Sequence, residues 1–415
     1  MKTKTKLRPL AAALLLAIPF LPSTEAQDAR PAAQYWVDAA TNSMSIPGMD
    51  DADDNSMAAS MMGGMMGGRG AGGAGAPGRS LDLSLYTRAR PSGTEGSHAI
   101  PPGMKMGDSL PLVPPKGAAP ASPREQFEGR AEKPKGRILL YWGCGDAVRA
   151  GQPRIVDFSK ASPADYGKFM SGRYVADRAN RNGNAVWPNE RDSKRVPRDA
   201  SLTGNHAVTG EGVPPSLKFA VDSANDFLPA LRMSAPGDPK QAVTVEWNSL
   251  ANAKAYFLTA MGSKGRGEGD MILWSSSEQP EPGWGLMDYL PPASISKFLE
   301  EKVILPPSTQ KCTIPQGIFA DAEGAMVRMI GYGPELNLAY PPRPKTGAWN
   351  PEWTTRVRVK STGMAMLGQD DSRRGARGSR PGREAPAQDG TSGSSGSGSG
   401  TGGNPMDVLK GIFGR

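Results

Sequence analysis

One short run of the sequence alternates strictly between apolar and polar residues. Residues 243–247 read Val, Thr, Val, Glu, Trp, so every second side chain is apolar. This is the period of a β-strand with one buried face, because successive side chains of a strand point to opposite sides. Two apolar runs follow at 253–262 and 271–277. The glycine-rich stretch 263–270 separates them, which indicates a hairpin. We therefore expect a mainly β protein.

Further strand-like runs divide the ordered part of the chain into two predicted domains. The first covers 136–235 and includes a long irregular loop at 160–212, and the second covers 240–365. Residues 294–303 carry apolar side chains at helical spacing and end before two prolines, which predicts one short amphipathic helix. The expected architecture is one or two β-sandwich-like domains with proline-rich wrapping segments and disordered N- and C-terminal arms. The remaining strand-like runs are 137–142, 154–158, 216–221, 227–233, 311–319 and 325–333.

Glycine and proline limit how much of the chain can form a compact core. The 52 glycines and 39 prolines are about a fifth of the residues, compared with roughly 12% in globular proteins. We interpret 27–81 as a disordered Met/Gly-rich leader, because its small and polar residues offer too little apolar surface for a core. Residues 82–135 are predicted to be a proline-rich extended segment. Residues 366–403 are rich in Arg, Gly and Ser and predict a disordered tether.

The first 26 residues have the three-part layout of a secretory signal peptide. Four basic residues lie within the first eight positions, an apolar run follows at 10–21, and small residues surround Ala26. The run is shorter than the roughly 20 residues that cross a bilayer. We therefore expect a periplasmic or secreted protein with no membrane span after signal removal. The segment carries four basic residues and one acidic residue, so its removal lowers the net charge from +8 to +5. Such a balance does not indicate a nucleic-acid binder.

Part of the second predicted domain resembles the fibronectin type III-like sandwiches. The similarity rests on a strand that ends in Trp247, a short turn, a strand at Ala255-Tyr256, and a later strand that leads to Gly331-Tyr332-Gly333. It covers about residues 240–335. The resemblance implies a β-sandwich, a fold that hosts many unrelated functions.

The two cysteines predict a disulfide bond. Cys144 and Cys312 each lie at the end of a strand-like run. An even number of cysteines in an exported protein is first a sign of disulfide formation. The bond would tie the first predicted domain to the second.

Two other uses of the cysteines stay open. Cys144 lies between two glycines, a setting in which a thiol nucleophile can be exposed beside backbone N–H groups. His98 and His206 are the only histidines that could serve as its base. The two cysteines and two histidines also have the ligand types of a zinc site, although they lack the short paired spacings of such sites.

Methionine and tryptophan suggest two further ligand classes. Seven methionines lie between positions 44 and 66, and thioethers are soft ligands suited to Cu(I). This segment is similar to the methionine-rich segments of exported copper-handling proteins, but it lacks histidine. Trp284, Trp349 and Trp353 are possible carbohydrate contacts, because sugars stack on aromatic rings. The alternative is that these rings cover the edge of a sandwich. We expect Trp247 and Trp274 in the core.

The last twelve residues, 404–415, predict an amphipathic docking helix. Asn404 is a suitable N-cap, and Pro405 suits the first turn. A helix of this length is marginal alone and is expected to form on a partner. The apolar docking residues are Val408, Leu409, Ile412 and Phe413.

Together these features favour an exported, non-catalytic envelope or secreted interaction protein that binds another protein or an envelope polymer. A carbohydrate-binding β-sandwich is the alternative, and Cu(I) handling and a cysteine hydrolase are further alternatives. We expect no catalytic residue, no cofactor and no bound metal.

Overall fold

Strands form the framework of the protein, as the alternation predicts. The computed structural model describes residues 30–45, 77–116, 136–157, 159–162, 169, 172–173, 175, 183–265 and 269–368. Within these ranges sixteen strands form three sheets, and the α-helix Pro292–Glu300 spans nine residues. The protein is therefore mainly β. No helix in the described ranges is long and apolar enough to cross a membrane.

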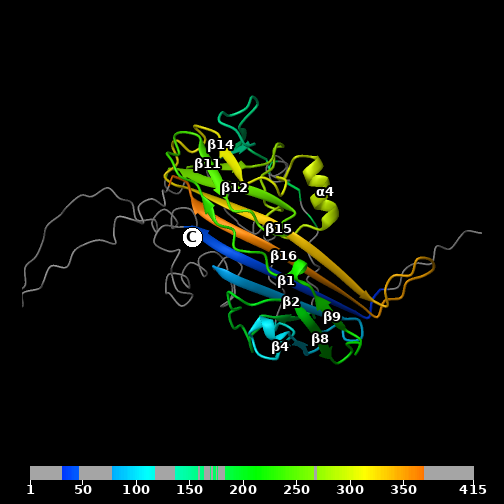
Figure 1. Cartoon of the computed structure of the whole chain (residues 1–415). Coiled ribbons are helices and arrows are strands. Elements are labelled where there is room, and N and C mark those ends of the chain that lie inside the picture. Colours follow the sequence, from blue (N-terminus) through cyan, green and yellow to red (C-terminus); the bar gives the residue numbers. More distant parts are fainter. Residues whose placement is uncertain are drawn as a thin grey trace, which may run out of the picture.

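The largest sheet has nine strands. In spatial order they are β6 (Arg154–Asp157), β5 (Arg137–Trp142), β13 (Asp270–Ser275), β12 (Ala255–Lys264), β15 (Ala325–Tyr340), β16 (Trp353–Met366), β1 (Ala33–Ser45), β2 (Gly78–Thr87) and β7 (Ala185–Trp187). Neighbours are antiparallel except for two parallel pairs, β5 with β13 and β1 with β16. The longest strands, β15, β16 and β1, run diagonally across the molecule in Figure 1.

Two smaller sheets pack on one face of the nine-stranded sheet, which we call the core face. One contains β4 (Ser109–Leu112), β3 (Gly96–Ala99), β8 (Gly204–Gly210) and β9 (Lys218–Val221), and the other contains β10 (Met233–Ser234), β11 (Val243–Trp247) and β14 (Lys311–Ile314). Short 3-10 turns lie at η1 (Pro102–Met104) and η2 (Ser223–Asn225). Val37 and Leu83 of the large sheet share one buried cluster with Val208 and Val245 of the smaller sheets. Figure 1 shows β11 and β14 near one end of the long strands and β4, β8 and β9 on the far side of β2.

The opposite side of the large sheet, which we call the outer face, is covered in part by α4 (Pro292–Glu300). Ile295 and Phe298 of the helix pack with Phe257 and Ile330, which pair across β12 and β15. The predicted helix at 294–303 is thus confirmed. It ends before Lys302, whose φ of 55° is left-handed.

The expectation of core tryptophans is also confirmed. Trp247 and Trp274 are 6% and 1% exposed. Both belong to the cluster between the core face and the smaller sheets. The burial of Trp247 follows from the alternation, because it lies on the apolar side of its strand, whereas Trp274 lies in a strand that is buried on both faces.

The prediction of a disordered leader at 27–81 is wrong for the residues that the structure describes there. β1 lies between β16 and β2, so its backbone groups are paired on both sides. Tyr35 and Val37 are buried in the core. These distant partners outweigh the low hydrophobicity of the surrounding sequence. Similarly, the segment 82–135 contains β3 and β4, and the predicted loop 160–212 contains β7 and β8.

The predicted boundary between 136–235 and 240–365 does not separate two sheets. β5 and β6 come from the first range, but they extend the sheet that β12, β13, β15 and β16 of the second range build. The contact is the parallel pairing of Ile138 with Met271 and of the residues that follow. Alternation identifies strands, but it does not indicate which distant strands pair.

Candidate functional site

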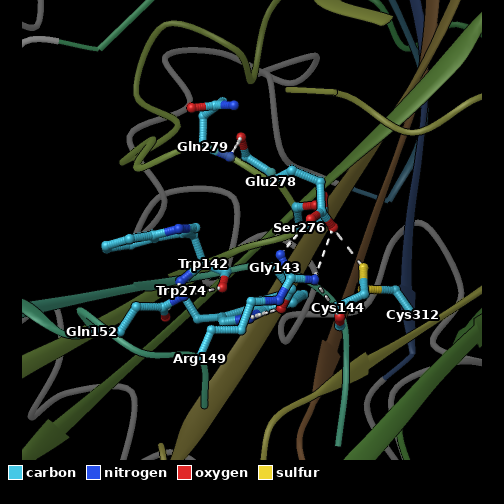
Figure 2. A network of polar contacts seen from close by, with 11 residues as sticks. Trp142, Gly143, Cys144, Arg149, Gln152, Trp274, Ser276, Glu278, Gln279 and Cys312 are labelled. Atoms are coloured by element: carbon cyan, nitrogen blue, oxygen red, sulfur yellow. Dashed lines mark hydrogen bonds and ion pairs between the residues drawn. A yellow bond between two sulfur atoms is a disulfide. The ribbon is translucent and has the colours of Figure 1, made fainter. Parts of the chain in front are cut away.

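The two cysteines form the predicted disulfide bond. The Sγ atoms of Cys144 and Cys312 are 2.09 Å apart, and the Cα atoms are 5.3 Å apart. Cys144 follows the end of β5, in the nine-stranded sheet, and Cys312 lies in β14, in the three-stranded sheet (Figure 2). The bond therefore ties these two sheets together across 168 residues of sequence.

Hydrogen bonds fix the loop that carries Cys144. Trp274 donates its indole N–H to the carbonyl of Gly143 at 2.9 Å. The backbone N–H of Gly145 donates to the carbonyl of Thr313, also at 2.9 Å. Gly143 has a φ of 95°, a conformation that favours glycine. The glycine beside the cysteine thus serves a tight turn at the end of β5.

Arg149 completes this network, as Figure 2 shows. It donates to the carbonyl of Cys144 at 3.0 Å and pairs with the carboxylate of Glu278. The guanidinium therefore holds the loop against the segment that follows β13. Because the sulfur of Cys144 is bonded to Cys312, it offers no free thiol, and the cysteine hydrolase alternative lacks its nucleophile.

The two histidines lie in a buried hydrogen-bonded chain between β1, β3 and β8. The Tyr35 hydroxyl lies 2.8 Å from Nδ1 of His98, and Nε2 of His98 lies 2.9 Å from Nδ1 of His206. Nε2 of His206 lies 2.7 Å from the carbonyl of Leu202. A carbonyl only accepts, so each nitrogen and the hydroxyl in the chain has one consistent role when both rings are neutral.

Burial keeps both rings neutral. It lowers the pKa of His98 well below its ordinary value, and the electrostatic interaction with the neighbouring His206 lowers it further. Burial also lowers the pKa of His206, against the smaller raising effect of the Leu202 carbonyl. The histidines bond to each other and the cysteines bond to each other, so the four residues do not form the zinc site considered above. Among the described residues no group of three or more His, Cys, Asp and Glu is placed to hold a metal.

The three tryptophans considered for carbohydrate contact differ in exposure. Trp284 is 39% exposed. Trp349 is half-buried and donates its indole N–H to the carbonyl of Pro341 at 3.0 Å. Trp353 is only 4% exposed, and its ring lies against Tyr340 with centroids 6.2 Å apart. The ring of Trp353 is therefore not available as a surface platform.

These tryptophans are not brought together. Gly283, which precedes Trp284, packs against Phe257, and Phe257 pairs with Ile330 of β15. Trp353 pairs with Tyr340, ten residues further along β15. At about 3.3 Å per residue this separation is about 30 Å. A single sugar platform made of the three rings is not formed.

Several predicted features lie outside the described residues. These are the signal peptide 1–26, the methionine-rich stretch after Met44, and the tether beyond 368. The docking helix 404–415 with Val408, Leu409, Ile412 and Phe413 also lies there. They stay predictions from the sequence.

The outer face of the long strands carries a cluster of charged and aromatic side chains that the sequence did not reveal. Residues paired on neighbouring strands point to the same face. One row across the sheet therefore contains Asp82, Asp38, Arg358 and Glu335, and the next contains Ser84, Trp36, Arg356 and Asn337. We use the name Trp36 cluster for Trp36, Asp38, Tyr289, Glu335, Asn337, Arg356, Arg358 and Lys360.

Arg358 is the buried anchor of the Trp36 cluster. Its Nε and Nη2 donate to the two carboxylate oxygens of Asp38, each at 2.6 Å. The two side chains are 8% and 7% exposed. The guanidinium carbon lies 4.9 Å from the centroid of the Trp36 ring and 4.5 Å from that of Tyr289. Such bidentate and cation–π contacts hold the two rings in fixed positions.

The protonation states of this anchor follow from its surroundings. Burial lowers the pKa of Arg358, but the hydrogen bonds and charge of Asp38 outweigh burial and raise it above its ordinary value. Burial raises the pKa of Tyr289 well above its ordinary value, and the charges of Asp38 and Asp82 raise it further. The guanidinium therefore stays charged and the phenol stays neutral.

Arg356 and Asn337 form the exposed rim of the cluster. Nε of Arg356 donates to Oδ1 of Asn337 at 2.9 Å and lies 3.4 Å from Oε1 of Glu335. The guanidinium carbon is 4.6 Å from the centroid of the Trp36 ring. The side chain of Arg356 is 39% exposed, and in the described part of the chain its terminal nitrogens have no hydrogen-bond acceptor. The rim thus presents ordered donors to solvent.

Lys360 extends the cluster toward α4. Its Nζ lies 2.7 Å from Oδ1 of Asp288 and 4.2 Å from the centroid of the Tyr289 ring. The segment before α4 is thereby attached to the long strands. One signal for the cluster was present in the sequence: Arg356, Arg358 and Lys360 alternate with two valines, which indicates a strand with one cationic face.

Comparison with protein-family models, with curated proteins and with solved structures gives no match to this chain.

Proposed function

We propose that this protein is an exported, non-catalytic binding protein and that the Trp36 cluster is its ligand-binding surface. The observation that supports this most is the arrangement of Arg356. Its Nε is held by Asn337 and its guanidinium lies over Trp36, while its terminal nitrogens remain exposed. Arginine and tryptophan dominate the energetics of many interfaces. Side chains ordered before binding lose less conformational entropy when a ligand arrives.

The anchor beneath the rim supports the same proposal. A charge pair as buried as Arg358 with Asp38 adds little net stability, because desolvation offsets much of the attraction. In this proposal the pair serves to position Trp36 and Tyr289. The rim then has a rigid base on three paired strands, β1, β16 and β15.

The disulfide supports the exported location. Disulfide bonds persist mainly in oxidising compartments such as the periplasm and the extracellular space. The predicted signal peptide at 1–26 is consistent with this location. The ligand in this proposal is a component of the envelope or of the space outside the cell.

Co-sedimentation with the envelope fraction of the native cells tests this function. We compare the purified protein with the double variant Arg356→Ala/Asn337→Ala. Arg343→Ala, which removes an exposed arginine from the β15–β16 hairpin loop, is the matched control. We expect the wild type and the control to sediment with the envelope, and we expect the double variant to stay in solution.

Equal sedimentation of the double variant and the wild type would contradict the proposal, provided that both have the same melting temperature. The proposal would also be contradicted if none of the three proteins bound either to the envelope fraction or to material from the culture medium.

A further inference from the structure

We infer that the ligand of the Trp36 cluster is a neutral, polyhydroxylated molecule, such as a short oligosaccharide. This inference rests on the proposed function and adds the chemical class of the ligand. It places the contact on side chains other than the three tryptophans that the sequence suggested. It is supported by two buried acceptor atoms, by the balance of charge in the cluster and by the width of the site.

The first buried acceptor is Oε2 of Glu335. The side chain of Glu335 is 5% exposed, and its other oxygen, Oε1, accepts a hydrogen bond from Nδ2 of Asn337 at 2.9 Å. Within the described residues Oε2 has no hydrogen-bond partner. A buried carboxylate oxygen without a donor is costly. This atom therefore needs an O–H or N–H group from outside the described residues.

The second buried group lies on the other side of Trp36. Nδ2 of Asn184 donates to the hydroxyl of Ser84 at 2.9 Å, and Ser84 pairs with Trp36 across β2 and β1. Oδ1 of Asn184 has no partner among the described residues, and the residue is 7% exposed. If the side-chain amide of Asn184 were rotated by half a turn, its NH₂ group would take the place of Oδ1, and a donor would lack a partner instead of an acceptor. A ligand hydroxyl satisfies either orientation, because it both donates and accepts.

The charge of the cluster favours a neutral ligand. Each base has an acidic neighbour: Arg358 pairs with Asp38, Lys360 with Asp288, and Arg356 with Glu335. An anionic ligand would meet the unpartnered oxygen of Glu335, and a cationic ligand would meet Arg356. A hydroxyl group avoids both conflicts, because it can donate to Glu335 and accept from the terminal nitrogens of Arg356.

The width of the site favours an oligomer. Ser84 and Asn337 lie at the two ends of one row, on β2 and β15, with β1 and β16 between them. Three strand spacings of about 4.8 Å give about 14 Å. This is longer than one monosaccharide, so short oligomers are the appropriate probes.

Isothermal titration calorimetry with linear tetramers of glucose, mannose, galactose and N-acetylglucosamine tests the inference, with a galacturonic acid tetramer as the anionic probe. Glu335→Gln replaces the unpartnered Oε2 with either an N–H donor or an amide oxygen, which is a weaker acceptor. Glu246→Gln makes the same change at an exposed site on β11 and is the matched control. Asn337→Ala is the second variant, since its exposed position makes it tolerant of substitution.

We expect at least one neutral tetramer to bind the wild type more tightly than the uronic acid tetramer does. Glu335→Gln should weaken that binding about tenfold or more, because hydrogen bonds to charged groups are strong. Glu246→Gln should leave it unchanged.

Three results would overturn the inference. The first is that no neutral tetramer binds, and the second is that the uronic acid tetramer binds most tightly. The third is that neither Glu335→Gln nor Asn337→Ala changes the affinity. If envelope binding still depends on Arg356 and Asn337 in these cases, the proposed function stands and only the ligand class is wrong. If that dependence is absent as well, both proposals fail.

Discussion

At the scale of single residues, stability is sensitive to the loss of one partner from a buried polar pair, even where the intact pair adds little net stability. Asp38 and Arg358 are both largely removed from water, and they neutralise each other through two hydrogen bonds of 2.6 Å. The removal of one partner takes these two hydrogen bonds and the nearest opposite charge away from a buried ion. Stability should therefore respond much more strongly to these residues than to exposed ion pairs.

Asp38→Asn should lower the free energy of unfolding by about 3–5 kcal/mol, because it removes the buried carboxylate that accepts two short hydrogen bonds from Arg358. Urea denaturation measures the change. Asp321→Asn is the control, since Asp321 pairs with Lys264 but is 69% exposed, and its substitution should have a much smaller effect because water screens exposed ion pairs. Equal changes in the free energy of unfolding for the two substitutions would contradict the prediction that burial makes the loss of Asp38 more destabilising.

The histidine chain predicts a fall in stability at mildly acidic pH. His98 and His206 titrate near pH 6.5 in an unfolded chain, and burial lowers both pKa values in the folded protein. Below about pH 6.5 the unfolded state therefore binds more protons than the folded state. The stabilisation is complete above that pH and is lost as pH falls, by at most about 1.4 kcal/mol per pH unit for each histidine.

Urea denaturation between about pH 7.5 and pH 5.5 measures this dependence, in a range above the pKa of ordinary carboxylates, near 4. The sequence contains only these two histidines, so the double variant His98→Phe/His206→Leu is the control. Its free energy of unfolding should not fall with pH in this range. A flat profile for the wild type would count against the buried neutral chain.

At the scale of elements, a β-bulge decides which face of β15 carries Glu335. Tyr332 pairs with Lys360 and Glu335 pairs with Arg358, so β15 has one more residue than β16 in this interval. Without the extra residue, position 335 would point to the core face. The bulge thus brings the carboxylate into the Trp36 cluster.

Gly333→Ala should destabilise the protein by about 1–3 kcal/mol, the usual range for overpacking. A Cβ at position 333 would lie 2.6 Å from the carbonyl oxygen of Val359 in β16, and this backbone atom cannot move without disturbing the sheet. Gly103→Ala is the control, because its nearest contact would be an ordinary 3.5 Å from Ser201. Thermal unfolding that shifts equally in both variants would contradict the tight packing at the bulge.

The elements differed in how well the sequence could predict them. The strand at 243–247 and the helix before Lys302 carry their own periodicity, and both were predicted. β1 contains Tyr35 and Val37, but its neighbours in sequence are polar or small, and it is stabilised by β16 and β2. No local pattern reveals such partners, because β16 is more than 300 residues away.

At the scale of the whole molecule, the disulfide joins the nine-stranded sheet to the three-stranded sheet. The double variant Cys144→Ser/Cys312→Ser should lose about 2–5 kcal/mol of stability. Thermal unfolding with and without a reductant measures this effect: the reductant should lower the melting temperature of the wild type and leave the variant unchanged. Two free thiols in the native protein would contradict the structure.

The candidate site shows where sequence reasoning reaches its limit. The cysteine pair was predictable because the sequence contains only two cysteines, each at the end of a strand-like run. The Trp36 cluster was not, because Asp38 and Arg358 are 320 residues apart and meet only through the pairing of β1 with β16. Trp353 was predicted as a possible carbohydrate contact because of its aromatic ring. It lies instead on the core face, where Tyr340 covers it.

We propose that ligands bind at the Trp36 cluster. Hydroxyl-radical footprinting of the full-length protein, with and without the native envelope fraction, tests it most directly. We expect the envelope to protect Trp36 and Tyr289 from oxidation and to leave the oxidation of Trp284 and Trp349 unchanged. Protection of Trp284 or Trp349 with no change at Trp36 and Tyr289 would contradict it.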